Sequence, residues 1–168
     1  MHIFKKEVIN EFLIVHTELI IYSSICFFLP FFLHQSQFIT GTIVNAALVL
    51  SALRLKTNKL LPIIVMPSLG VLMAGLLFNT LTTYLLYLIP FIWVSNALLV
   101  YFIKRINMKL VSLPVATTIK AGFLFSATVI LVKLTLIPSQ FLIAMGPIQL
   151  LTALSGGTIA LGINKIIN

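Results

Sequence analysis

The stretch LIPFIWVSNALLVYFIKRINMKLVSLPVATTIKAGFLFSATVILVKL, residues 88–134, holds two long apolar runs separated by a short basic link. A helix that crosses a bilayer needs about 20 mostly apolar residues, and each of the two runs is long enough. The link carries Lys104, Arg105 and Lys109 and no acidic residue. We therefore predict two membrane-spanning helices joined by a positively charged loop.

The same alternation of apolar runs and short links extends along the whole chain. Of its 168 residues, 60% are hydrophobic and only 8% are charged, whereas a soluble domain carries about 25% charged residues. The polar surface is too small to face water, so the natural solvent is lipid. We predict an all-α membrane protein, a compact bundle of six transmembrane helices forming one integral membrane domain. The expected helices cover residues 14–33, 39–55, 60–78, 82–103, 110–136 and 141–163.

Two local patterns refine this picture of the bundle. The run Pro67-Ser68-Leu69-Gly70 predicts a kink or a break in the third helix, because proline removes a backbone donor. Small residues four positions apart, such as Gly156 and Ala160, allow helix backbones to approach closely.

Basic residues gather on every second link, at Lys5, Lys6, Arg54, Lys56, Lys59, Lys104, Arg105, Lys109 and Lys165. The other links carry no Lys, Arg, Asp or Glu. Because cytoplasmic loops are enriched in Lys and Arg, this alternation places both termini in the cytoplasm. The same dispersal over loops, where anionic headgroups lie, argues against nucleic-acid binding in spite of the net charge of +8.

The sequence offers little for catalysis or for a cofactor. Its single cysteine, Cys26, cannot form an internal disulfide or hold an iron–sulfur cluster. There is no Asp, the three His residues are scattered, and neither a Gly-x-Ser-x-Gly turn nor a phosphate-binding glycine-rich loop occurs. We expect no enzyme activity, no cofactor and no metal site.

Four polar residues, Asn45, Asn96, Lys120 and Gln149, lie deep in the second, fourth, fifth and sixth predicted helices. Such groups are costly in a membrane and therefore tend to mark a site or an internal pair. Lys120 lies about ten residues, or roughly 15 Å, from the inner end of its helix, too deep to reach the surface easily. Two interpretations remain open: Lys120 is paired inside the bundle, or it faces a ligand.

Few acidic residues could pair with Lys120, and Lys133 is the other basic residue outside the basic links. The three acidic residues all lie near the N-terminus, and Glu18 could reach Lys120 only if the first and fifth helices adjoin. Lys133, close to the outer end of its helix, can extend to the surface.

Trp93 lies three residues before Asn96, on the same helix face. An indole beside an amide and a buried lysine would suit a planar or anionic organic ligand, although a lone Trp also fits a position near the membrane interface. The predicted substrate-binding residues are therefore Asn45, Trp93, Asn96, Lys120 and Gln149.

Four segments carry a resemblance to a known family: residues 40–46 (TGTIVNA), 90–100 (PFIWVSNALLV), 119–121 (IKA) and 145–157 (MGPIQLLTALSGG). Together they resemble the substrate-binding membrane subunits (S components) of energy-coupling factor transporters, in particular an uncharacterised branch of that fold. The resemblance extends over roughly residues 25–160.

This resemblance implies a six-helix bundle with a pocket toward its outer face, in the plasma membrane of a prokaryote. It also implies a transmembrane coupling subunit and two cytoplasmic ATP-hydrolysing subunits as partners. We therefore expect a substrate-capture subunit for a small organic micronutrient. The alternative is a non-transporting membrane scaffold or assembly subunit, whose polar residues merely satisfy one another.

Overall fold

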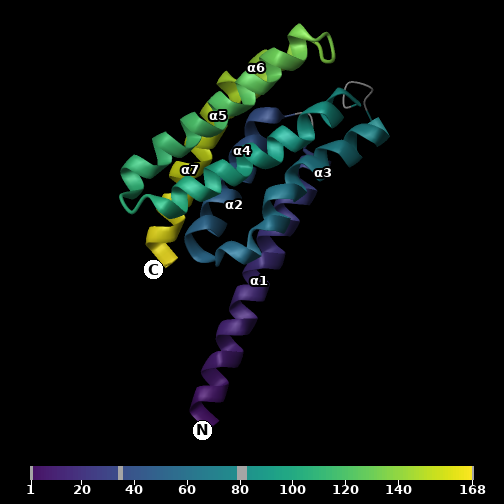
Figure 1. Cartoon of the computed structure of the whole chain (residues 1–168). Coiled ribbons are helices and arrows are strands. Elements are labelled where there is room, and N and C mark those ends of the chain that lie inside the picture. Colours follow the sequence, from purple (N-terminus) through teal and green to yellow (C-terminus); the bar gives the residue numbers. More distant parts are fainter. Residues whose placement is uncertain (1, 34–35, 79–82, 168) are drawn as a thin grey trace.

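The computed structural model describes residues 2–33, 36–78 and 83–167, and their side chains over residues 12–33, 36–75 and 83–167. The described chain is a bundle of helices (Figure 1): α1 (His2–Phe32), α2 (Gln37–Arg54), the 3-10 turn η1 (Thr57–Lys59), α3 (Leu61–Phe78), α4 (Leu85–Arg105), α5 (Lys109–Lys133), α6 (Phe141–Met145) and α7 (Pro147–Ile167). Six helical segments of this part are long and apolar enough to cross a membrane. The prediction of an all-α protein with six membrane-spanning segments is confirmed.

Most helix ends lie within three residues of the predicted ones, and the differences have local causes. The predicted start of the fourth helix at residue 82 lies outside the described residues. α1 begins at His2 rather than at residue 14, because no Pro or Gly interrupts the residues between. α5 ends at Lys133 rather than at residue 136, and Thr135 there has a φ of 58°, which is incompatible with a continuing helix.

The last span is two helices, which corrects the prediction of one helix over residues 141–163. α6 ends at Met145, Gly146 has φ −107° and ψ −96°, and α7 begins at Pro147. Proline disfavours a helical conformation in the residue before it and suits the first position of a new helix. The break expected near Pro67 does not occur, since α3 runs through Pro67 without interruption.

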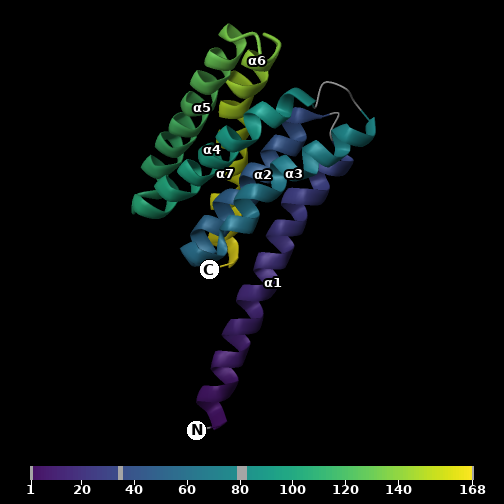
Figure 2. The same cartoon turned by 45° about the vertical axis from the view of Figure 1, so that its right-hand side comes forward.

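α2 occupies the centre of the bundle, where it contacts α1, α3, α4 and α7 (Figure 2). Its residues from Val44 to Ala52 are all buried. Glycines allow two of the closest helix approaches: a Cβ at Gly156 of α7 would lie within 2.2 Å of the Thr42 carbonyl oxygen of α2, and one at Gly70 of α3 equally close to the Phe27 carbonyl oxygen of α1. Backbone therefore packs on backbone at these two crossings.

Basic side chains cap the C-terminal ends of two helices. Lys104 Nζ donates to the carbonyl oxygens of Ala52 (2.9 Å) and Leu55 (2.6 Å) at the end of α2. Lys109 Nζ donates to the Ile103 carbonyl oxygen (3.0 Å) near the end of α4. These carbonyls lack partners within their helices and carry partial negative charge. The basic links thus meet at one end of the bundle, and the side of the membrane that this end faces stays a prediction.

Replacing Lys104 by methionine is expected to lower the free energy of unfolding by about 1.5–3 kcal/mol, the range for hydrogen bonds to a charged group. Lys56→Met is the matched control, because Lys56 is an exposed cation of the link between α2 and α3, and its side chain has no hydrogen bond to the described residues. Unfolding titrations in mixed micelles would measure both variants. Equal losses would show that the two capping hydrogen bonds contribute nothing beyond the charge.

Candidate functional site

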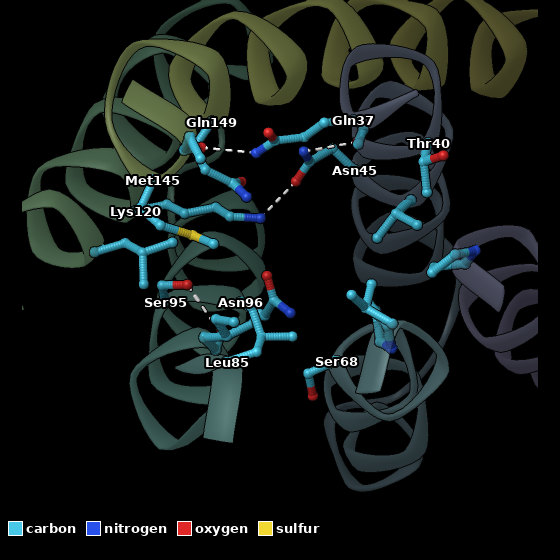
Figure 3. Close-up of a pocket in the computed structure, with 18 of the residues that line it drawn as sticks. Gln37, Thr40, Asn45, Ser68, Leu85, Ser95, Asn96, Lys120, Met145 and Gln149 are labelled. Carbon is cyan, nitrogen blue, oxygen red and sulfur yellow. Dashed lines mark hydrogen bonds between the residues drawn. The ribbon is translucent and has the colours of Figure 1, made fainter. Parts of the chain in front are cut away.

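A cavity of about 370 Å³ lies among the helices, and each α-helix from α1 to α7 contributes at least one lining residue (Figure 3). Its walls combine apolar side chains with a smaller polar set. The polar lining residues are Gln37, Thr40, Asn45, Ser68, Ser95, Asn96, Lys120 and Gln149. The volume is within the range of small-molecule sites, which enclose roughly 300–1,000 Å³.

The structure brings four of the five predicted binding residues to this one cavity: Asn45, Asn96, Lys120 and Gln149. The fifth, Trp93, does not line it. Its indole Nε1 instead donates to Ser68 Oγ at 2.7 Å, and Ser68 does line the cavity. Trp93 thus lies behind the wall, where it orients a lining hydroxyl, and its ring offers no stacking face to the cavity.

Lys120 reaches the cavity from α5 and is held by an amide of α2. Its side chain is 3% exposed, and Nζ donates to Asn45 Oδ1 at 2.5 Å. The Asn45 amide nitrogen donates to the Gly41 carbonyl oxygen (2.8 Å) and to Thr152 Oγ1 (3.3 Å). Thr152 Oγ1 in turn donates to the Gln149 carbonyl oxygen (3.2 Å). Because the Asn45 amide nitrogen donates to Gly41 and Thr152, the Asn45 oxygen must face Lys120.

No described carboxylate balances the charge of Lys120. Glu18 lies 2.5 Å from Arg54 Nη2 and also accepts from Arg54 Nε at 2.6 Å. The chain has no Asp, and the side chains of Glu7 and Glu11 lie outside the described residues. Burying an ion without a counter-ion costs several kcal/mol, and an ammonium has three donors, of which the described residues take one.

Two further polar groups at the cavity have unused hydrogen-bonding capacity. Asn96 donates from Nδ2 to the Ile64 carbonyl oxygen at 3.1 Å, while its Oδ1 accepts from no group in the described part of the chain. The Gln149 side chain likewise has no hydrogen bond to described residues. Both side chains point toward the same space as Lys120 (Figure 3). The Lys120 ammonium of α5, the Asn96 oxygen of α4 and the Gln149 amide of α7 thus line the same cavity.

The break between α6 and α7 borders the cavity, since Met145 before it and Gln149 after it are both lining residues. Interrupted backbone at membrane depth is tolerated where it is enclosed by protein or lines a cavity. The signal that could have located the break was the dipeptide Gly146-Pro147.

Sequence reasoning also missed four polar lining residues: Gln37, Thr40, Ser68 and Ser95. The hydroxyls of Ser68 and Ser95 each donate to the carbonyl three residues back in their own helix, as Ser commonly does in helices, so their presence in an apolar run carries no signal for a site. The Thr40 hydroxyl donates to the Leu33 carbonyl oxygen between α1 and α2. Gln37 lies in a predicted link, yet its Nε2 donates across the bundle to the Ala144 carbonyl oxygen of α6 at 2.9 Å.

The described lining residues can contribute to ligand binding. A single cation, a few amides and hydroxyls, and apolar walls can orient a small molecule and desolvate it. Within the described residues, no three His, Cys, Asp or Glu side chains come together to hold a metal ion. Comparisons with protein-family models, with curated proteins and with solved structures found no match to this chain.

Proposed function

We propose that this chain captures a small organic micronutrient as the substrate-binding subunit of an importer of the energy-coupling factor type. The observation that carries the proposal is the cavity, into which Lys120 brings a buried charge that no described carboxylate balances. A structural lysine would be expected to meet a carboxylate or a full set of acceptors, because unpaired buried charge is costly. A charge left available inside an apolar cavity favours ligand binding.

The distribution of polar groups supports capture. Ligand sites are mostly apolar clefts with a few convergent polar groups that fix orientation. Here Lys120, Asn96 and Gln149 converge from α5, α4 and α7. All three lie in the segments that resemble S components, and Asn45, which positions Lys120, lies in a fourth such segment.

The proposed partners follow from the same resemblance: a transmembrane coupling subunit and two ATP-hydrolysing subunits in the plasma membrane of a prokaryote. Six membrane-spanning segments and an absence of nucleotide-binding motifs in the sequence suit a subunit whose energy is supplied by partners.

One observation favours the second candidate, a membrane scaffold or assembly subunit. Lys120 does have an internal acceptor in Asn45 Oδ1. A buried polar network whose groups pair with one another can have a purely structural role, which is to specify helix packing. A scaffold has no need for a cavity of this size at that network, however, and this is why capture is the preferred function.

Lys120→Ala tests the proposal. Wild-type protein purified in mild detergent is expected to retain a small molecule in native mass spectra, and the variant is expected to lose it while remaining folded. Lys133→Ala is the control, because Lys133 is an exposed cation at the end of the same helix. Co-purification of ATP-hydrolysing subunits with the tagged chain would test the transport assignment. A scaffold would retain neither a molecule nor those subunits.

A further inference from the structure

We propose that the cavity selects a small organic monoanion, a monocarboxylate with an apolar body, whose carboxylate pairs with Lys120 Nζ. This inference rests on the proposed capture function and names the class of molecule captured. It follows from the charge of the cavity, from the way Lys120 is held, and from the nature of the remaining walls.

The charge of the cavity is that of one buried cation. Among the described lining residues Lys120 is the only Lys, Arg, Asp or Glu, and Glu18, the one acidic residue whose side chain is described, pairs with Arg54. A ligand with one negative charge makes the occupied cavity neutral. A cation would add a second buried positive charge, and a dianion would leave an unpaired negative one, each at a cost of several kcal/mol.

The orientation of the buried Lys120 side chain is fixed by Asn45. Asn45 uses both amide hydrogens on Gly41 and Thr152, and its oxygen accepts from Lys120, so its amide groups are occupied before a ligand arrives. Asn45 therefore acts as a positioning residue, and the donors left on Nζ remain for the ligand. A carboxylate offers two oxygens to such donors, in charge-assisted hydrogen bonds stronger than neutral ones.

The other lining residues indicate the nature of the rest of the ligand. Val71, Ile92, Leu124 and Phe141 line the cavity and suit an apolar body. The Asn96 Oδ1 acceptor suits one donor group on that body. At about 370 Å³ the space is near the lower limit for drug-sized ligands, so the molecule is small.

Matched acids and amides test the inference. The probes are hexanoate, 3-phenylpropionate and decanoate, each compared with its own primary amide, added to the full chain in nanodiscs of uncharged phosphatidylcholine. Trp93, the only tryptophan of the chain, reports occupancy by fluorescence because it donates to the cavity-lining Ser68. Compact acids represent ligands from water, whereas decanoate represents an acyl chain from the membrane.

At least one acid is expected to bind roughly tenfold more tightly than its amide, which corresponds to about 1.4 kcal/mol of binding free energy. Lys120→Met should remove this preference, and Lys133→Met should keep it. Asn45→Asp gives a second variant that retains the lysine: a carboxylate placed beside Nζ would neutralise it and also remove the preference. The inference is overturned if no acid is preferred to its amide, or if the preference survives in both Lys120→Met and Asn45→Asp.

Failure of this inference is distinguishable from failure of the capture function. If amides bind as tightly as acids and Asn96→Leu weakens both, the chain captures small molecules but does not select anions. If no probe binds and the purified chain retains no small molecule, capture itself is wrong and the inference falls with it.

Discussion

Asn45→Leu is expected to lower the free energy of unfolding by about 1.5–3 kcal/mol, because it removes the hydrogen-bond acceptor of a buried ammonium. Asn45 is 1% exposed and supplies the acceptor that the described residues offer to Lys120 Nζ. Leucine keeps the branched shape of asparagine, with the same number of side-chain heavy atoms, so the loss chiefly reports the missing polar contacts. Unfolding titrations in mixed micelles would measure it.

The double variant Asn45→Leu/Lys120→Met is the decisive control. With both polar partners removed, no charge is left buried, and apolar replacements of similar volume are often neutral or stabilising. Stability should therefore return to near the wild-type value, although ligand binding stays absent. Asn96→Leu, which removes a single hydrogen bond to Ile64, should cost only about 0.5–1.5 kcal/mol. A double variant as unstable as Asn45→Leu alone would show that Asn45 stabilises the bundle independently of Lys120.

Gly156→Ala should cost about 3 kcal/mol and also weaken ligand binding. The new Cβ would lie 2.2 Å from the Thr42 carbonyl oxygen and 2.8 Å from the Ala46 backbone nitrogen, and neither atom can turn aside as a side chain would. α2 and α7 must therefore move apart, and overpacking of this kind costs about 1–3 kcal/mol or more. Because Asn45 lies on the same contact, Lys120 would lose its position as well.

Gly122→Ala provides the matched comparison. Gly122 lies on the exposed side of α5, and a Cβ there meets no atom within 4 Å. Alanine has the higher helix propensity by about 1 kcal/mol, so this variant should be neutral or slightly more stable. Equal destabilisation of the two variants would mean that the α2–α7 contact does not decide the effect. Thermal unfolding with and without ligand separates the two contributions.

The membrane-spanning segments could be predicted because the constraint that produces them acts locally. Lipid requires each span to satisfy its own backbone, so a run of apolar residues reveals a helix without knowledge of its neighbours. The same constraint made Lys120 conspicuous. A charge that cannot reach the surface must face the interior, and the structure places it there, 3% exposed.

The partners of these residues could not be predicted, because they depend on which helices adjoin. Lys120 meets Asn45 from 75 positions away, and Glu18 meets Arg54 from 36 positions away. Trp93 donates to Ser68 for the same reason, since α4 packs on α3.

The position of the helix break also depends on the tertiary structure. Local chemistry predicts a kink or a break near Pro67, yet α3 runs through Pro67 and the break lies at Gly146-Pro147. Phe125 of α5 packs against Gly146, where a Cβ would lie 2.6 Å from its ring. Glycine at the break thus leaves room for a neighbour that a local sequence pattern does not include.

The contact between α2 and α7 has a consequence for how this protein can diversify. A Cβ at Gly156 would lie 3.0 Å from the Asn45 Cβ, so the residue that positions Lys120 also belongs to one of the two crossings where backbone packs on backbone. Substitutions at Asn45 or Gly156 would alter recognition and folding together, and selection would remove most of them. New ligand preferences can arise more readily at Ile92 and Phe141, apolar walls outside that crossing. On the proposed capture function, relatives of this chain should therefore share the charged end of their ligands and differ in the apolar body.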